Sequence, residues 1–353
     1  MSKWEKYKLG DVVTFGNGKE RPKAKGTIPV YGGNGILDFT NDYNYDGETI
    51  VIGRVGAYCG SVYYADKPIW VSDNALAAKV KGDNNPQFLY YFLRHLNLNG
   101  FAEGSSHPLV TQRLLNSIDI IVPDDVNVQK TIASILSSLD DKIDLLNHEN
   151  ATIEQIAETI FRQWFIEDAK DEWEEVVLED VAILNAGGDK PKMVSQSRTS
   201  ELNVPIYSNG IDNEGLYGYT DSPRIIEESV TISARGTIGY VVLRTEPFVP
   251  IVRLITIRPK EKVTSKFLYY WAKAQNINGT GTTQQQLTVP DFKQTKIVLP
   301  EKALIDKFTN VANQFYEKII SNKRQIQTLI NTRNGLLPKL MSNEIRLKKT
   351  VKQ

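Results

Sequence analysis

The hydrophobic pattern along the chain alternates between short apolar runs and long helical repeats. Up to Pro123, and again up to Pro300, runs rich in valine, isoleucine and tyrosine are separated by clusters of glycine, asparagine, aspartate and proline. Such runs are typical of strands joined by turns. After each proline, apolar residues recur at alternating spacings of four and three, which is typical of a coiled-coil seam. The pattern therefore predicts two strand-rich modules, each followed by a long helix.

These changes of pattern divide the chain into four parts. The parts are a first module at residues 1–124, a first spacer helix at 125–168, a second module at 169–302, and a second spacer helix with a C-terminal tail at 303–353. Within the modules we expect strands at Thr49–Ile52, Ile118–Val122, Ser229–Ser233 and Ile251–Ile257, and short helices at Phe88–Leu96 and Lys266–Ala274. The predicted fold class is α+β, with two mixed α/β modules separated by two long helices that form an antiparallel coiled coil.

The second half of the chain repeats the first. The opening segment Trp4–Val12 returns as Trp173–Val181, and Phe88–Arg94 returns as Phe267–Lys273. Three further matches keep the same order. Ile28–Ile36 matches Val204–Ile211, and Ile50–Gly56 matches Val230–Gly236. Gly104–His107, followed by Ile120–Pro123, matches Gly281–Gln284, followed by Ile297–Pro300. Because the order is preserved, we interpret the chain as a tandem duplication whose two modules share one fold.

The seam of each long helix contains one asparagine among apolar residues. The seam positions are Leu136, Leu139, Ile143, Leu146, Asn150, Ile153 and Ile160 in the first helix, and Phe315, Ile319, Asn322, Ile326 and Leu329 in the second. A lone seam asparagine can fix the register of a coiled coil at a cost in stability. The alternative is that each asparagine faces solvent at an irregularity of the seam.

Charge is distributed unevenly, although the whole chain is neutral with 42 basic and 42 acidic residues. Residues 125–168 carry three basic and nine acidic side chains, a net charge of −6, and residues 303–353 carry ten and three, a net charge of +7. Opposite charge favours pairing of the two helices with each other, although two separately solvated faces would have the same composition. An antiparallel pair would place the modules at opposite ends of a helix roughly 55 Å long, which exceeds one turn of B-DNA, about 34 Å.

The composition excludes several classes of protein. The single cysteine, Cys59, rules out an internal disulfide framework and a thiolate zinc site. No apolar run is long enough to span a membrane and no secretory signal opens the chain, so we expect a cytoplasmic protein. The chain has no phosphate-binding Gly-x4-Gly-Lys-Ser/Thr loop, and Asn85-Pro86-Gln87-Phe88 lacks the second proline of a methyltransferase target loop. We therefore expect no catalytic residue and no metal site.

The ordered, duplicated set of motifs resembles the specificity subunits of type I restriction–modification systems. The resemblance covers essentially the whole chain. It rests on the motif Trp-Glu-x-x-x-Leu-x-Asp-Val in both halves and on the Gly-Ser/Thr element before a strand that ends in proline. It also rests on the segments Phe161–Phe165 and Gly335–Met341 of the long helices. No single phrase is diagnostic, whereas the duplicated set is specific.

This resemblance implies a function and a set of partners. Each module would read one half of a bipartite, asymmetric target in double-stranded DNA, while the helices set the gap and dock two methylation subunits. Those subunits would carry S-adenosylmethionine and methylate adenine, and restriction subunits would supply cleavage driven by ATP and Mg. The chain itself would be non-catalytic, would bind no cofactor and would have no contact with a membrane.

The candidate DNA contacts lie in loops and at strand ends, where side chains can reach base edges or phosphates. In the first module they are Lys19, Lys25, Asn34, Arg54, Ser105, Ser106 and His107. In the second module they are Lys190, Lys192, Asn209, Arg235, Thr282, Thr283, Gln284, Gln285 and Gln286. The two glycine-led loops occupy matching places with different chemistry, as two modules that read different half-sites require.

Alternatives remain open for each kind of candidate. The glycine-led loops can be ordinary solvated turns, the two strand-end arginines can form ion pairs that hold the fold, and the two asparagines can serve only turn geometry. The lysines can be solvated loop charges. For the whole chain, the near-neutral modules also suit a duplicated protein-interaction scaffold that binds no DNA. An enzyme with an unrecognised site ranks last, because no clustered acid–base or nucleophilic set is found.

Overall fold

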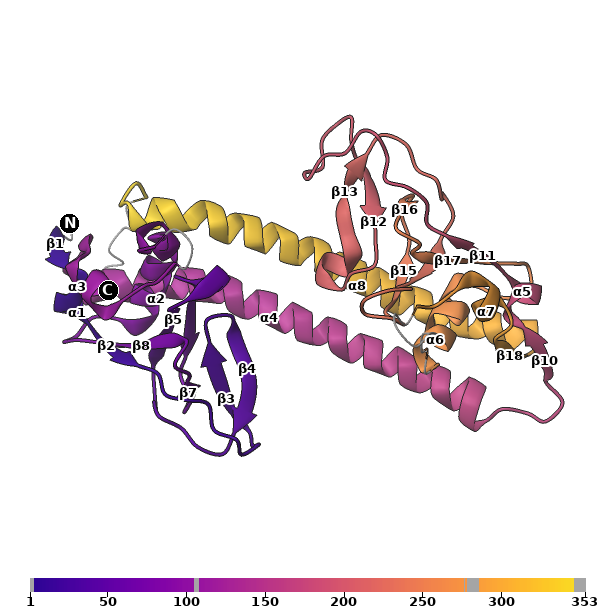
Figure 1. The fold of residues 1–353 in the computed structure, drawn as a ribbon, viewed down its shortest axis with the longest axis horizontal. Helices are drawn as coiled ribbons and strands as arrows, with labels where there is room; N and C mark the ends of the chain where they lie inside the picture. The colour runs from indigo at the N-terminus through magenta and orange to yellow at the C-terminus, as the bar shows by residue number, and fades with distance from the viewer. Residues whose placement is uncertain (1–2, 105–107, 276, 278–285, 346–353) are drawn as a thin grey trace, which may run out of the picture. The chain divides into compact units, whose positions relative to one another are not determined.

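The chain forms two compact units, each built from one module and part of both long helices (Figure 1). The computed structural model describes residues 3–104, 108–275, 277 and 286–345. Unit 1 comprises residues 1–146 and 324–353, and unit 2 comprises residues 147–323. Among the described residues, no helix is long and apolar enough to cross a membrane.

The first module consists of small sheets around one packed helix. Its elements are β1 (Trp4–Lys8), α1 (Leu9–Val12), β2 (Val13–Asn17), β3 (Ile28–Gly32), β4 (Gly35–Thr40), β5 (Thr49–Gly53), η1 (Gly56–Tyr58), β6 (Val62–Ala65), β7 (Trp70–Val71), β8 (Ala75–Val80), α2 (Pro86–His95), η2 (Leu98–Phe101), α3 (Gln112–Ser117) and β9 (Asp119–Pro123). Its sheets have the strand orders β2-β8-β5-β6, β4-β3-β7 and β1-β9. Pairing of β1 with β9 joins the two ends of the module.

The second module has the same topology. Its elements are β10 (Glu174–Val177), α5 (Leu178–Val181), β11 (Ala182–Ala186), β12 (Val204–Tyr207), η4 (Asp212–Gly215), β13 (Leu216–Thr220), β14 (Ser229–Ile232), β15 (Val241–Arg244), β16 (Val249–Pro250), β17 (Ile255–Pro259), α6 (Ser265–Ala274), α7 (Val289–Lys293) and β18 (Lys296–Leu299). The strand orders β11-β17-β14-β15, β13-β12-β16 and β10-β18 match those of the first module strand for strand. The predicted duplication and the predicted α+β class are confirmed.

One predicted strand, Ile251–Ile257, is confirmed only at Ile255–Ile257. The apolar run Ile251–Ile257 was expected to be continuous, but β16 ends at Pro250 and β17 begins only at Ile255. Val252 and Arg253 between them have φ values of 53° and 60°, in the left-handed region. Alternation of apolar residues is a local signal, and it does not register the backbone contacts from elsewhere in the module that hold this turn.

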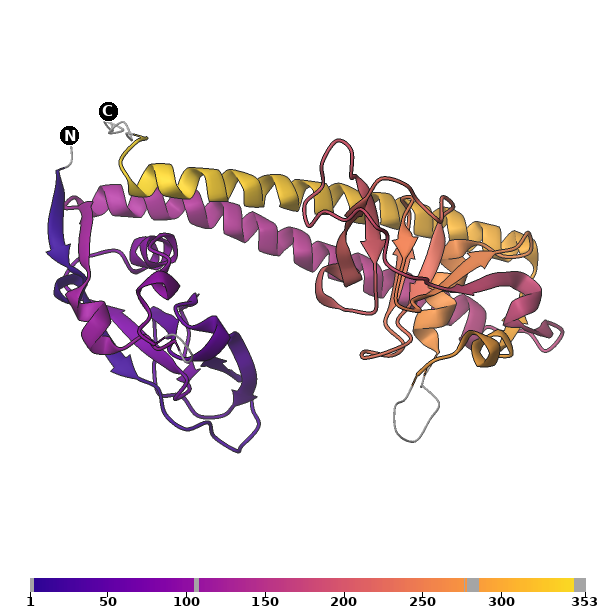
Figure 2. The same cartoon turned by 45° about the horizontal axis from the view of Figure 1, so that its top comes forward.

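The two long helices are α4 (Val126–Arg162), which continues as a short π-helical segment at Gln163–Glu167, and α8 (Lys302–Met341). They lie antiparallel within each unit (Figure 2). In unit 1 the Arg333 side chain of α8 pairs with Asp140 of α4. In unit 2 the Lys318 ammonium lies 3.1 Å from a Glu149 carboxylate oxygen. These ion pairs join the two helices beside the apolar seam.

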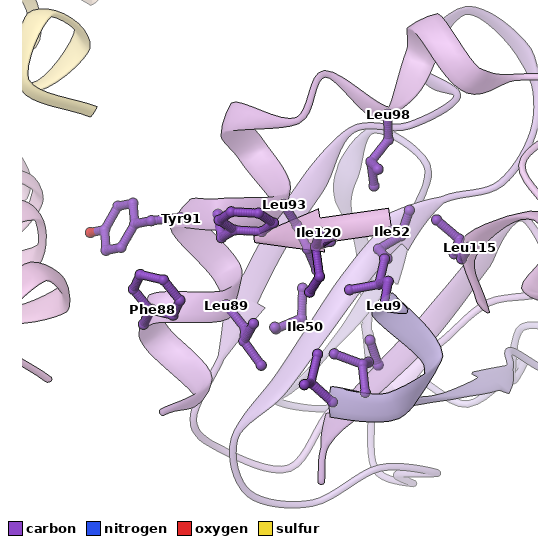
Figure 3. Packing of buried hydrophobic residues seen from close by; sticks show 14 of the residues in the cluster. Leu9, Ile50, Ile52, Phe88, Leu89, Tyr91, Leu93, Leu98, Leu115 and Ile120 are labelled. Carbon is purple, nitrogen blue, oxygen red and sulfur yellow. The ribbon is translucent and has the colours of Figure 1, made fainter. Parts of the chain in front are cut away.

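The larger of the two buried clusters in each unit contains residues of the module and of both helices. In unit 1, α2 packs its apolar face against β5 (Figure 3), and Leu136 of α4 and Leu340 of α8 belong to the same buried cluster. In unit 2, Phe308 of α8 lies 5.4 Å from Phe161 of α4 and 5.5 Å from Tyr270 of α6, measured between ring centroids. Burial of apolar side chains is the main stabilising term in folding, so neither module has a complete core without the helices.

The seam positions are buried to different degrees. Fully buried positions are Leu136, Ile143, Leu146, Ile319 and Asn322, and half-buried positions are Leu139, Asn150, Ile153, Ile160, Phe315, Ile326 and Leu329. Asn322 is only 2% exposed, and its amide donates to Asn150 Oδ1 at 2.9 Å and to a Glu149 carboxylate oxygen at 2.8 Å. The interpretation that Asn322 faces solvent is therefore wrong, and the seam asparagines pair with each other.

We predict that Asn322→Ala lowers the free energy of unfolding by about 1–3 kcal/mol, because a buried hydrogen-bonded amide is lost and its partners lose their donor. Chemical denaturation of the purified chain measures this change. Ser321→Ala, at the neighbouring exposed position, is the control and should stay within about 0.5 kcal/mol of wild type. A double-mutant cycle with Asn150→Ala that gives no coupling energy would contradict a direct interaction between the two asparagines.

Candidate nucleic-acid interface

In the second module, Arg235 stands just beyond the end of β14, where two other segments converge. The backbone N–H of Ala234 donates to Asn209 Oδ1 at 2.7 Å, and the Ala234 carbonyl accepts from the N–H of Leu287 at 3.0 Å. The exposed Arg235 guanidinium donates to the Gln286 side-chain oxygen at 3.1 Å. The strand-end arginine is therefore placed beside the C-terminal flank of the glycine-led loop.

The turn at Val252–Arg253 lies against the same segments. The N–H of Val252 donates to the Gly188 carbonyl at 3.0 Å, and that of Arg253 donates to the Gly187 carbonyl at 2.9 Å. The Asn209 amide donates to the Val252 carbonyl at 2.6 Å. Asn209 thus joins the Ala234 backbone to the Val252 backbone. This favours the interpretation that Asn209 serves backbone geometry.

Gly187 is required where the two backbones meet. A Cβ atom at residue 187 would lie 2.8 Å from the backbone nitrogen of Ile251, closer than real Cβ contacts. A Cβ at Gly188 would meet only the tip of the Arg224 side chain, at 3.0 Å. The close approach at Gly187 is therefore what allows the 187–188 backbone to accept both hydrogen bonds from the turn.

A pocket of about 360 Å³ opens between these segments. The residues that line it include Gly187, Arg235, Arg253, Gln286, Thr288 and Pro290. Arg253 is exposed and, like Arg235, forms no ion pair with any described residue. Two guanidinium groups and one carboxamide thus converge on one opening, a combination of donors and acceptors suited to an anionic or base-like ligand.

Further cations surround the 187–192 segment. The Lys190 ammonium lies 5.9 Å from the centroid of the Tyr217 ring, and Lys192 is exposed. Arg224, whose guanidinium approaches Gly188, is also exposed. Of the predicted candidates in the second module, the structure therefore brings together Asn209, Arg235 and Gln286, while Lys190 and Lys192 follow Gly188 along the chain. Thr282, Thr283, Gln284 and Gln285 lie outside the described residues.

The first module repeats this arrangement around Gly18 and Lys19. A Cβ at Gly18 would lie 1.8 Å from the Ser72 carbonyl oxygen, so only glycine fits there. The N–H of Lys19 donates to the Val71 carbonyl at 3.0 Å, which leaves the exposed side chain beside the end of β7. Gly18 and Lys19 thus occupy the place of Gly187 and Gly188.

Arg54 occupies the place of Ala234, and Val55 that of Arg235, so the strand-end arginines of the two modules are offset by one residue. The N–H of Arg54 donates to the Asn74 carbonyl at 2.9 Å, and its own carbonyl accepts from the N–H of Val110 at 2.9 Å. Next to it, Val55 forms a bridge with Leu109, which also pairs with Glu103. The described flanks of the first glycine-led loop therefore lie beside Arg54. Ser105, Ser106 and His107, in that loop, lie outside the described residues.

The remaining candidates of the first module are separate from this cluster or at its edge. Asn34 is exposed in the turn between β3 and β4, and Lys25 is exposed between β2 and β3. Neither Arg54 nor Arg235 forms an ion pair with another described residue, so the fold-holding ion-pair interpretation is wrong for both. The Nε atom of Arg54 is buried without a hydrogen-bond partner among the described residues.

Sequence reasoning missed Arg253. Its position inside an apolar run favoured a strand interior, where an arginine would serve only packing or solubility. The available signal was the repeat itself, since Arg253 aligns with Asn74 in the segment where Val249–Pro250 matches Trp70–Val71. Both residues lie next to the strand-end arginine of their module.

Tyrosines of α2 and α6 attach each module to α4. In unit 1 the Tyr91 hydroxyl, which points away from the core in Figure 3, donates to an Asp140 carboxylate oxygen at 2.7 Å. In unit 2 the Tyr269 hydroxyl donates to Glu154 at 2.7 Å, and the Lys273 ammonium lies 2.8 Å from the same carboxylate. Burial and the neighbouring carboxylate raise the pKa of Tyr269 far above its usual value. These contacts fix the short helices on the long one.

Comparison with known proteins identifies relatives of the whole chain. A family model described as the type I restriction modification DNA specificity domain matches residues 1–155 and 170–331. A putative type I specificity subunit of Mycoplasma pneumoniae is 28% identical, over 91% of this chain and 94% of that protein. A second putative type I specificity subunit of the same organism is 30% identical, over 73% of this chain and 81% of that protein.

A solved structure shares the fold. The crystal structure of a type I restriction–modification system S subunit from M. genitalium aligns with a TM-score of 0.64 at 18% identity, and the match covers 96% of each chain. At this identity the likeness bears on the fold alone. It extends over both modules and both long helices.

We predict that Gly187→Ala lowers the free energy of unfolding by about 1–3 kcal/mol, because the new methyl group overlaps the backbone of Ile251. Gly188→Ala is the matched control, since only a flexible side-chain tip lies near its Cβ position. Chemical denaturation of both variants gives the comparison. Equal stabilities for the two variants would show that the close approach at Gly187 does not constrain the turn.

Proposed function

The chain belongs to the family defined by the type I restriction modification DNA specificity domain, which matches both of its halves, and we propose from this premise that it reads a bipartite DNA target with one module for each half. Residues 1–124 and 169–302 act as the two target-recognition domains. The helical segments at 125–168 and 303–353 set the gap between the half-sites. The chain carries no catalysis of its own and acts as a subunit of an adenine-methylating and DNA-cleaving complex.

One observation carries this proposal: both modules place polar and cationic side chains around the same point of one fold, with different chemistry. The first module presents Lys19 and Arg54 beside Asn74. The second presents Arg235 and Arg253 beside Gln286. A shared scaffold with different donors and acceptors is what the reading of two different half-sites requires, because base edges are distinguished by their hydrogen-bonding patterns. A scaffold that binds no DNA has no use for this difference.

The helices supply the surface for methylation subunits in this proposal. Exposed apolar side chains lie along α4 and just after it, with Leu145 59%, Ile156 44% and Ile166 50% exposed. In unit 2, a pocket of about 660 Å³ includes Phe161 and Ile166 in its lining. Exposed apolar surface of this kind is typical of protein–protein contacts. Two methylation subunits dock there, and restriction subunits join the complex through them.

Cofactors belong to the partner subunits in this proposal. S-adenosylmethionine binds to the methylation subunits, and ATP and Mg act in the restriction subunits. The near-neutral charge of both modules is consistent with this division, since the partners then supply much of the phosphate contact that dominates DNA affinity. The chain alone therefore binds DNA weakly and in a strongly salt-dependent way, and binding tightens when a methylation subunit is present.

We predict a methylome of defined form. When the chain is expressed with its methylation subunit in a host that lacks adenine methylation, modified adenines should fall within one bipartite motif with a fixed gap. Genome-wide sequencing of modified bases measures this. Exchange of residues 169–302 for the second module of a related subunit should change one half of the motif and leave the other half unchanged.

The methylation subunit expressed alone serves as the control and should modify no bipartite site. If a confirmed complex of both proteins produced no new methylation, the DNA-reading proposal would fail. A motif whose two halves both changed when only one module was exchanged would contradict the assignment of one half-site to each module.

A further inference from the structure

Two adjacent residues of the second module have a backbone conformation that is costly for their side chains. Val252 and Arg253 have φ values of 53° and 60°. Left-handed backbone is uncommon outside glycine and asparagine, and for a β-branched residue such as valine it is a genuine outlier. Strain of this kind persists only where the surroundings hold it, and it concentrates at sites where a side chain must take one position.

The turn is held by the 187–188 backbone, by the Asn209 side chain and by a hydrogen bond of its own. Backbone N–H groups of Val252 and Arg253 donate to the carbonyls of Gly188 and Gly187, and the N–H of Leu254 donates to the Ile251 carbonyl at 3.0 Å. The Asn209 side chain holds the Val252 carbonyl at 2.6 Å. A turn with four such contacts has a fixed direction, so the Arg253 Cα–Cβ bond has one orientation.

Arg253 lines a pocket together with two other side chains that can form hydrogen bonds with a ligand. Arg235 and Gln286 line the same pocket as Arg253 and are joined by a hydrogen bond of 3.1 Å. The Arg253 side chain is exposed and forms no ion pair or hydrogen bond with any described residue through its guanidinium. None of its five guanidinium N–H donors is therefore taken by a described residue.

We propose that Arg253 determines specificity in the second module by donating two hydrogen bonds to O6 and N7 of a guanine in the major groove. This inference rests on the proposed function and adds to it a residue and a base. The planar fork of arginine matches the two acceptors of guanine, and this pairing is the commonest specific contact between proteins and DNA. Contact with a phosphate needs only a positive charge within reach, for which a flexible lysine on an unstrained loop suffices.

The first module differs at the same place. Its turn carries Asp73 and Asn74, and neither belongs to the described residues other than glycine that have positive φ values. The Asn74 carbonyl accepts the N–H of Arg54, so this turn still supports the strand-end arginine. At this place in the repeat, the strained turn and the arginine that it carries are thus specific to the second module. A feature that served only the common scaffold would be expected in both modules.

The test uses the chain in complex with its methylation subunit, with methylated adenines mapped across the genome. Arg253→Ala and Arg253→Gly remove the guanidinium, and glycine also adopts the left-handed backbone without strain, so this variant keeps the fold. Arg253→Lys keeps the charge but cannot form the paired hydrogen bonds. The control Lys262→Ala removes an exposed cation from beyond the other end of β17.

For Arg253→Ala and Arg253→Gly we expect methylation of the wild-type motif to fall about ten- to hundredfold relative to motifs that differ at one guanine. That guanine should lie in the half-site that module exchange assigns to the second module, and the other half-site should stay unchanged. Arg253→Lys should restore overall methylation in part while the same position stays relaxed. Lys262→Ala should reproduce the wild-type motif.

Two results would overturn the inference while leaving the proposed function intact. If Arg253→Lys kept the full wild-type motif, the residue would contact phosphate only. If Arg253→Gly kept the motif, the residue would have no part in recognition. A wild-type complex that methylated no bipartite motif would overturn the inference together with the function on which it rests.

Discussion

The structure depends on the burial of apolar surface where each module meets the antiparallel helix pair. In unit 1, Leu136 and Leu340 from the two helices complete a core whose other members come from small sheets and α2. In unit 2, Phe161 and Phe308 do the same around α6. The sheets of the modules have at most four strands, and the buried clusters that join them to α2 and α6 also contain residues of both long helices. The long helices are therefore part of the core of each unit.

This dependence explains how polar and strained features are tolerated elsewhere. The buried Asn322 pairs with Asn150 inside an otherwise apolar seam, which favours one register of the helices over shifted alternatives. The left-handed turn at Val252–Arg253 is held by backbone contacts from the 187–188 segment and by Asn209. In both places a locally unfavourable group is stabilised by a rigid frame. Each fixes a geometry that a flexible segment would leave undetermined.

The duplicated scaffold separates what is shared from what is specific. Gly18 and Gly187 both allow two backbones to approach closely, and Arg54 and Arg235 both stand just beyond a strand end. Around these common points the side chains differ, with Asn74 in one module and Arg253 in the other. A chain that reads two unlike half-sites can therefore keep one fold twice and vary only the residues around the strand-end arginines. This division follows the general rule that binding residues lie on loops placed by a rigid framework.

The sequence by itself determined the duplication, the two long helices, their seam and the residue types at the ends of the equivalent strands. These features depend on local periodicity and on repetition, both of which are visible in a single chain. Only the tertiary structure decided that Asn209 serves the backbone, that Asn322 faces Asn150, and that the run Ile251–Ile257 is broken to present Arg253. Those outcomes depend on hydrogen bonds between residues 25 to 172 positions apart, such as Asn209 with Ala234 and Asn322 with Asn150. Residue type and spacing along the chain carry no information about such contacts until the fold brings the partners together.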